Sequence, residues 1–140
     1  MESISCRVEA EAGHRFLDAR VDIVGDDLVV AVGGGERPHV GCVVLAQPYP
    51  SKEDPGAWSS SISVLCIPPH KEEPLARGIA KTLCAALGRV TVVTAGVHDD
   101  CIDAAGISTY LRLGEELAQA LVTTLREAVG QHSAPAERLE

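Results

Sequence analysis

Three apolar runs in this chain have the length and composition of buried strands. They cover residues 40–46, 62–67 and 90–95, and the stretch from Glu72 to Gly88 separates the second run from the third. Every fourth position in part of that stretch is apolar, as on the buried face of a helix: Leu75, Ile79, Leu83 and Leu87. The order strand, helix, strand predicts a crossover connection, which makes the two strands that it joins parallel.

A histidine lies at one end of each of these runs. His39 precedes the first run, and His70 and His98 follow the second and the third. Parallel strands place their carboxyl ends at one edge of a sheet, and an antiparallel first strand would begin at that edge. We therefore expect the three histidines to converge, together with Asp99 and the helix N-terminus near Pro74. Such a place is suited to a metal, an anion or both.

Apolar and polar residues alternate near the N-terminus, over residues 4–10 and again over 17–24. Such alternation is typical of strands with one solvent-exposed face. A Gly-Asp-Asp turn leads into residues 28–32, which predicts a hairpin that the three glycines at 33–35 would end. The segment 47–61 is broken by prolines, and we expect it to be an ordered functional loop without regular structure.

A second amphipathic helix is expected over residues 105–129, with Ser108 as a candidate N-cap and Gly130 as its end. Together these segments predict a single-domain α/β (α+β) fold, an antiparallel-to-mixed sheet of about six strands with two helices packed on one face. The domain would cover residues 1–130. The polar, proline-interrupted residues 131–140 would form a flexible C-terminal tail.

Composition limits the partners and the compartment that we expect. The formal net charge is −8 and there is no basic cluster, which argues against a nucleic-acid or anionic-membrane surface. No stretch reaches the ~18 apolar residues of a membrane span, and no leader segment is recognisable at the N-terminus. Five cysteines without a C-x-x-C spacing are typical of a reduced, cytoplasmic protein, so we expect all five thiols to be free.

The start of the first predicted helix allows two interpretations. Lys71 follows His70 there, and a phosphate could contact the helix N–H groups and the lysine together. Glu72 and Glu73 come next, and carboxylates in a first turn often only complement the helix dipole. The pattern therefore indicates either an anion site with His70 as a ligand or an ordinary acidic helix start.

The other edge residues are equally open to a structural interpretation. His98 with Asp99 could ligate a metal or form a polar turn, and His39 could be an edge histidine satisfied by its neighbours. The glycines at 33–35 lack the residues of a phosphate loop, and the serines at 59–61 lack the G-x-S-x-G turn of a hydrolase. Nucleophilic catalysis is therefore not indicated.

Three motifs of this chain resemble a known family. They are Pro38-His39-Val40-Gly41, His70-Lys71-Glu72-Glu73 and Gly96-Val97-His98-Asp99, and the similarity extends over about Gly33 to Leu125. The family is the prenylated-flavin chaperone domain, also known as an accessory component of gallate decarboxylase. The resemblance implies a small α/β fold akin to proteasome assembly chaperone 4, usually paired as a dimer. It also implies association with UbiD-type decarboxylases, and binding of prenylated FMN for delivery or maturation rather than catalysis of decarboxylation.

The resemblance and the predicted sheet edge are compatible. Prenylated FMN carries a phosphate, which would suit Lys71 at a helix N-terminus, and a large ring system on which Tyr49 or Trp58 could stack. Pro38 and His70 lie in the matching motifs and are further candidates for cofactor binding. A divalent metal ion could bridge the acidic protein and the phosphate, with ligands drawn from His39, His70, His98 and Asp99.

Two other classes of function remain open. A small metal-dependent enzyme would use the histidine cluster and keep one coordination position for an activated water. A pure assembly chaperone would use the fold for protein contact, and its histidines would be incidental. Our leading expectation is a non-catalytic, homodimeric binding protein for prenylated FMN that serves a UbiD-type decarboxylase.

Overall fold

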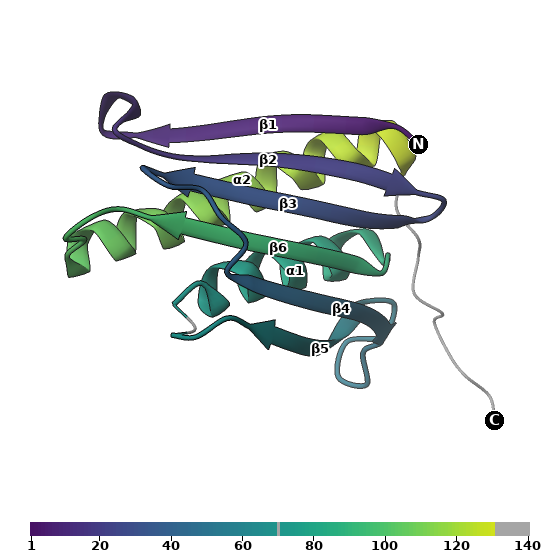
Figure 1. Cartoon of the computed structure of the whole chain (residues 1–140). Coiled ribbons are helices and arrows are strands. Elements are labelled where there is room, and N and C mark those ends of the chain that lie inside the picture. Colours follow the sequence, from purple (N-terminus) through teal and green to yellow (C-terminus); the bar gives the residue numbers. More distant parts are fainter. Residues whose placement is uncertain (70, 131–140) are drawn as a thin grey trace.

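The computed structural model describes residues 1–69 and 71–130, which form one sheet with two helices on one of its faces (Figure 1). His70 and the predicted tail at 131–140 lie outside the described residues. In chain order the elements are β1 (Ser3–Ala10), the 3-10 turn η1 (Glu11–Gly13), β2 (Arg15–Val24), β3 (Asp27–Gly35), β4 (Cys42–Pro50), β5 (Trp58–Cys66), α1 (Glu73–Leu87), β6 (Thr91–His98) and α2 (Ala104–Val129). Neither of these two helices is long and apolar enough to cross a membrane.

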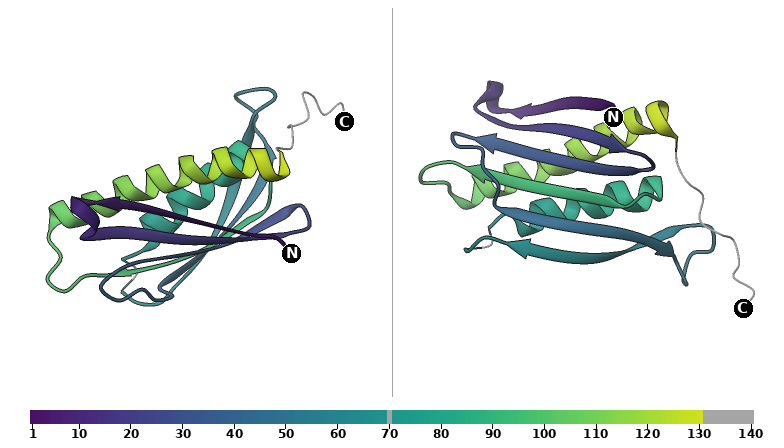
Figure 2. Two further views of the ribbon diagram at one scale, coloured as in Figure 1. Left: turned by 90° about the horizontal axis from the view of Figure 1, so that it is seen from above. Right: turned by 45° about the vertical axis from the view of Figure 1, so that its right-hand side comes forward.

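The strands follow the order β1-β2-β3-β6-β4-β5 across the sheet. β3 and β6 are parallel, and the other neighbouring strands run antiparallel. β4 lies antiparallel between β5 and β6, so the crossover through α1 leaves β5 and β6 parallel, as the sequence predicts. The prediction of a mixed sheet with two helices on one face is confirmed (Figure 2).

The core lies between the helices and the sheet, and the other face of the sheet is open (Figure 2). Alternate strand residues point to the helices, and four valines among them are completely buried: Val21, Val30, Val44 and Val93. The helix positions predicted from the spacing of four are buried as well. Burial of each such side chain contributes ~1.5–3 kcal/mol, so this layer holds the strands in one register.

The prediction of an irregular loop at 47–61 is wrong, because β4 and β5 continue through most of it as a hairpin paired up to Pro50 and Trp58. β4 stops pairing with β6 at Ala46, so its later residues have one neighbour only. The ladder bond from Ile67 N–H to the Gly41 carbonyl sets an alternation in which even-numbered residues of β4 turn their N–H away from β5. The prolines at 48 and 50 therefore remove no ladder bond.

Two predicted boundaries are wrong because glycine marks close packing here rather than a break. Residues 33–35 belong to β3, and a Cβ on Gly34 would lie 2.2 Å from the carbonyl oxygen of Phe16. α2 begins one turn earlier than Ser108 would place it. Its N-cap is Asp103, whose carboxylate accepts a hydrogen bond from the backbone N–H of Gly106 at 2.8 Å. Gly106 itself is buried beside Arg15.

Arg89 fastens the end of α2 to the sheet and provides a test of this packing. Its side chain is 5% exposed and donates hydrogen bonds of 2.6 Å to the carbonyl oxygens of Asp26 and Val129. Arg89→Ala should lower the free energy of unfolding by about 3 kcal/mol or more, because charge-assisted hydrogen bonds contribute ~1.5–3 kcal/mol each. Urea denaturation followed by circular dichroism measures the loss. Arg126→Ala, on the exposed side of α2, should change it by less than ~0.5 kcal/mol.

Candidate functional site

Four parts of the chain meet at the predicted edge of the sheet. β4 begins and β6 ends at this edge, and the N-termini of α1 and α2 lie beside it (Figure 1). His39 precedes β4 and His98 is the last residue of β6. The strand topology therefore places both described histidines of the predicted cluster at one edge.

A pocket of about 440 Å³ opens at this edge between β6 and the starts of the two helices. We call it the edge pocket. Most of its walls are apolar, and its polar groups come from the start of α1 and from the end of β6. It is lined by Lys71, Glu72, Leu75, Val97, His98, Asp99, Ile102, Ile107, Tyr110 and Leu111. Its volume falls within the ~300–1,000 Å³ of small-molecule sites.

Asp99 and Tyr110 form a fixed polar corner of the edge pocket. The Tyr110 hydroxyl donates to Asp99 Oδ2 at 2.6 Å, and the Glu36 backbone N–H donates to Oδ1 at 3.0 Å. Burial opposes ionisation of Asp99, but these two hydrogen bonds and the charge of Arg15 together hold its pKa below the ordinary value. Burial and the Asp99 hydrogen bond raise the pKa of Tyr110, so this hydroxyl stays protonated as a donor.

The two described histidines of the predicted cluster have separate partners. His39 Nε2 lies 3.0 Å from Glu72 Oε1, and its Nδ1 lies 3.1 Å from the Arg37 carbonyl oxygen. Both partners are acceptors, so a protonated imidazolium satisfies both contacts. His98 Nε2 lies 2.9 Å from Asp100 Oδ1, at the exposed side of the same edge.

The predicted metal ligands do not gather among the described residues. Within residues 1–69 and 71–130 there is no group of three or more His, Cys, Asp or Glu side chains that could hold a metal ion. Glu72 engages His39, Asp100 engages His98, and the hydroxyl of Tyr110 engages Asp99. His70, the fourth predicted ligand, lies outside the described residues. The divalent-metal site therefore stays a prediction.

The structure does not bring Tyr49 and Trp58 to the edge pocket. Both lie near the turn of the β4–β5 hairpin, where Pro50 pairs with Trp58. Cys42 starts β4 at the site edge, and the seven-residue step to Tyr49 spans roughly 23 Å along a strand. The two aromatic residues therefore lie at the opposite end of the sheet from Lys71.

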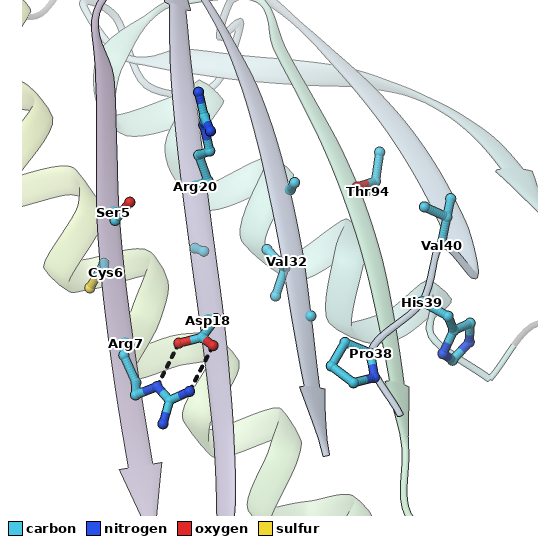
Figure 3. Close-up of a pocket in the computed structure, with 13 residues that line it drawn as sticks. Ser5, Cys6, Arg7, Asp18, Arg20, Val32, Pro38, His39, Val40 and Thr94 are labelled. Atoms are coloured by element: carbon cyan, nitrogen blue, oxygen red, sulfur yellow. Dashed lines mark hydrogen bonds and ion pairs between the residues drawn. The ribbon is translucent and has the colours of Figure 1, made fainter. Parts of the chain in front are cut away.

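Pro38 and His39 line a second hollow, on the open face of the sheet (Figure 3). Its volume is about 730 Å³, and it extends over β1, β2, β3 and β6. Arg7 and Asp18 form a bidentate ion pair on its floor, with N–O distances of 2.6 and 2.8 Å. Val40 continues its apolar part and is 57% exposed. Pro38 is thus placed on the open face rather than in the edge pocket.

Sequence reasoning missed the residues that α2 contributes to the edge pocket. Ile107, Tyr110 and Leu111 line it. The periodicity of this stretch predicts a core helix and no more. Ile107 and Leu111 are four residues apart but lie off the buried stripe, and this spacing is the signal that indicates a second apolar surface.

The fold and the edge pocket define a small α+β binding domain, with shape and charge suited to a ligand that has an apolar body and an anionic end. The chain belongs to the prenylated flavin chaperone LpdD-like domain family, whose model matches residues 11–126. The family resemblance seen in the motifs is confirmed, and with it membership of a family of chaperones.

Two known proteins are similar to this chain. Protein LpdD of Lactiplantibacillus plantarum is 25% identical over 132 residues, which are 93% of this chain and 88% of that protein. A chain in the crystal structure of a novel chaperone complex for yeast 20S proteasome assembly aligns with a TM-score of 0.60 and 17% identity, covering 89% of this chain and 97% of that one. The second similarity shows a shared fold.

Asp99→Asn tests the polar corner of the edge pocket. The substitution should lower the free energy of unfolding at neutral pH by about 1–3 kcal/mol, because an amide holds Tyr110 and Arg15 less well than a carboxylate. The folded-state pKa of Asp99 is lowered, so its stabilising contribution is present above the unfolded pKa of ~3.9 and is lost as the pH falls through the folded value.

Urea denaturation at several pH values from roughly 3 to 7 measures this effect. The difference between wild type and Asp99→Asn should shrink below about pH 4, where the carboxylate becomes protonated. Tyr110→Phe, which keeps the carboxylate, should retain more of the pH dependence. A difference that stays constant over the whole range would contradict the assigned role of Asp99.

Proposed function

We propose that this chain binds prenylated FMN and supports the delivery of that cofactor to, or its maturation in, a UbiD-type decarboxylase. The family to which the chain belongs carries the name of a prenylated flavin chaperone. The observation in this molecule that carries the proposal is the edge pocket, which combines apolar walls with a helix N-terminus that no described side chain caps. Each end of the cofactor has a chemically matching part of the pocket.

The phosphate end of the cofactor matches the start of α1. The N-cap residue Glu72 turns its carboxylate to His39, so within the described part of the chain no side chain caps the first turn of the helix. Glu73 pairs with Arg77 one turn further along. The backbone N–H groups of the first turn and the exposed Lys71 are then the donors that a phosphate would meet, and the helix dipole favours an anion there.

The ring system of the cofactor matches the apolar wall formed by α2. Ile107 is 51% exposed and Leu111 is 40% exposed, so a flat apolar ligand would remove aliphatic surface from water. In this proposal the ring packs on these residues. Tyr49 and Trp58, the aromatic candidates from the sequence, lie too far along the hairpin to contact a ligand whose phosphate is at Lys71.

Co-expression with a flavin prenyltransferase tests the function most directly. Protein purified from such cells should carry a flavin absorption band, and addition of this protein to a decarboxylase lacking its cofactor should restore decarboxylation. Bound metal without flavin would favour a small metal-dependent enzyme. Neither flavin nor metal would favour a pure assembly chaperone, and either of these two results contradicts the proposal.

Lys71→Ala should weaken binding of prenylated FMN about tenfold to a hundredfold, because it removes a charge-assisted hydrogen bond worth about 1.5–3 kcal/mol. Titration followed by flavin absorbance or fluorescence measures the affinity. Lys81→Ala removes an equal charge from an exposed position in the middle of α1 and should leave the affinity unchanged. Equal losses in the two variants would mean that Lys71 acts through net charge alone.

The role of a divalent metal is decided by the same titration. In a metal-assisted form of the proposal, chelator treatment lowers the affinity of the wild type to that of His98→Ala, because the phosphate loses the cation in both samples. Unchanged affinity after chelation removes the metal from the proposal and leaves the helix N-terminus and Lys71 as the phosphate site.

We propose that a second copy of the chain covers the open face of the sheet. Large apolar side chains are exposed there, at 41% for Val29, 57% for Val40, 76% for Leu65 and 60% for Ile67. Val43 and Leu45 lie between them in register and are half-buried. Such an area is larger than single scattered apolar residues and suits face-to-face packing of two sheets.

Leu65→Glu should convert the proposed dimer into a monomer, because the packed face would have to bury an unpaired carboxylate. Light scattering coupled to size-exclusion chromatography measures the mass. Lys81→Glu changes the charge on the opposite, helical side of the molecule and should leave the dimer intact. A wild-type chain that is monomeric at all concentrations, or a dimer unaffected by Leu65→Glu, contradicts this arrangement.

A further inference from the structure

Two of the five cysteines face each other across neighbouring strands. Cys42 is the first residue of β4 and Cys66 is the last residue of β5, and the two are direct partners in the antiparallel register. Cys42 is completely buried and Cys66 is partly buried, both on the side of the sheet that packs against the helices. Their separation in the sequence gives no sign of this contact.

The pairing of these strands places the two cysteines at a narrow site. The hydrogen bond from the Ile67 N–H to the Gly41 carbonyl, 2.8 Å long, joins the preceding residue pair. By the alternation of an antiparallel ladder, the pair Cys42–Cys66 is then a non-hydrogen-bonded pair, in which the Cα atoms are ~4.5 Å apart. That separation lies within the ~4.4–6.8 Å that a disulfide spans.

We propose that Cys42 and Cys66 form an oxidisable dithiol, which closes to a cross-strand disulfide by exchange with a small disulfide such as glutathione disulfide. The Cys66 thiolate attacks one sulfur of the oxidant, the disulfide bond of the oxidant breaks, and one glutathione leaves and takes up a proton. Cys42 then loses its proton to solvent and attacks the Cys66 sulfur, which releases the second glutathione. The two cysteines lose two electrons, and the oxidant is reduced to two thiols.

The order of these steps follows from exposure and from the state of the two thiols. Cys66 is the more accessible partner and is the one that a soluble oxidant meets first. Burial, together with a hydrogen bond and the charge of Cys66, raises the pKa of the Cys42 thiol, so Cys42 stays protonated until the second step. Cys42 is therefore the resolving residue.

The other three cysteines provide internal controls. Cys6 lies on β1, across the sheet from β4, Cys84 is buried in α1, and Cys101 is exposed after the end of β6. None of these three is the register partner of another cysteine. The intramolecular disulfide is thus expected at one pair only.

The position of the pair links the disulfide to the edge pocket. Gly41, next to Cys42, packs against the carboxylate of Glu72, which lines the pocket. A bond between Cys42 and Cys66 ties the start of β4 to the end of β5, immediately before the connection that carries Lys71. The proposal itself stands on the strand register and does not depend on the flavin-binding role.

The test is oxidation of the intact chain with glutathione disulfide, followed by thiol titration under denaturing conditions. The reduced protein should show five free thiols and the oxidised protein three once glutathione adducts have been excluded by mass spectrometry. Proteolysis without reductant should yield one linked peptide pair that contains Cys42 and Cys66. Treatment with dithiothreitol should restore all five thiols.

Variants separate this disulfide from other oxidation. Cys66→Ser, at the partly buried position, should abolish the loss of the thiol pair, whereas Cys101→Ser should still lose two thiols. Cys42→Ser should behave as Cys66→Ser does, and the partly exposed partner keeps the test valid where the buried substitution impairs folding. Retention of both thiols under the oxidant, or their conversion to separate glutathione adducts, overturns the proposal.

Discussion

The buried carboxylate of Asp99 connects four segments of the chain that are distant in sequence. It follows β6, accepts hydrogen bonds from Tyr110 of α2 and from the backbone N–H of Glu36 after β3, and faces Arg15 of β2 at 3.6 Å. A buried charge is costly unless its lone pairs are satisfied, so the three partners are held at fixed distances from one another. Because Tyr110 also lines the edge pocket, the shape of the pocket depends on this same carboxylate.

The second constraint is the connection between β3 and β4, which crosses the end of β6. Arg37, His39 and Gly41 donate backbone hydrogen bonds to three carbonyl oxygens of β6, with lengths of 3.1, 3.3 and 3.1 Å. A Cβ on Gly96 would lie 1.7 Å from the His39 carbonyl oxygen, so the crossing needs glycine at that position. The crossing allows β4 to insert between β6 and β5 and brings the His39 ring to Glu72.

Periodicity in the sequence was sufficient for the fold but not for the contacts at the site. The burial pattern of strands and helices depends on local spacing, and it predicted the crossover and the shared edge correctly. The pairing of Tyr110 with Asp99, and that of Cys42 with Cys66, depends on register and on helix placement, which no local pattern encodes. The prediction for the segment after Ala46 failed for a related reason, since the continuation of β4 through its prolines depends on where the neighbouring strand β6 stops pairing.

His39 connects the two surfaces of the proposed function. Its ring belongs to the hollow on the open face of the sheet, and the carboxylate that it binds, Glu72, lines the edge pocket (Figure 3). The Glu72 side chain is 10% exposed, so movement of His39 away from it would leave a carboxylate largely buried without its partner. A second copy on the open face and a ligand in the edge pocket would therefore act on the same ion pair from opposite sides. The free energy of each binding event then includes the same cost or gain at Glu72, which is the physical basis for coupling between them.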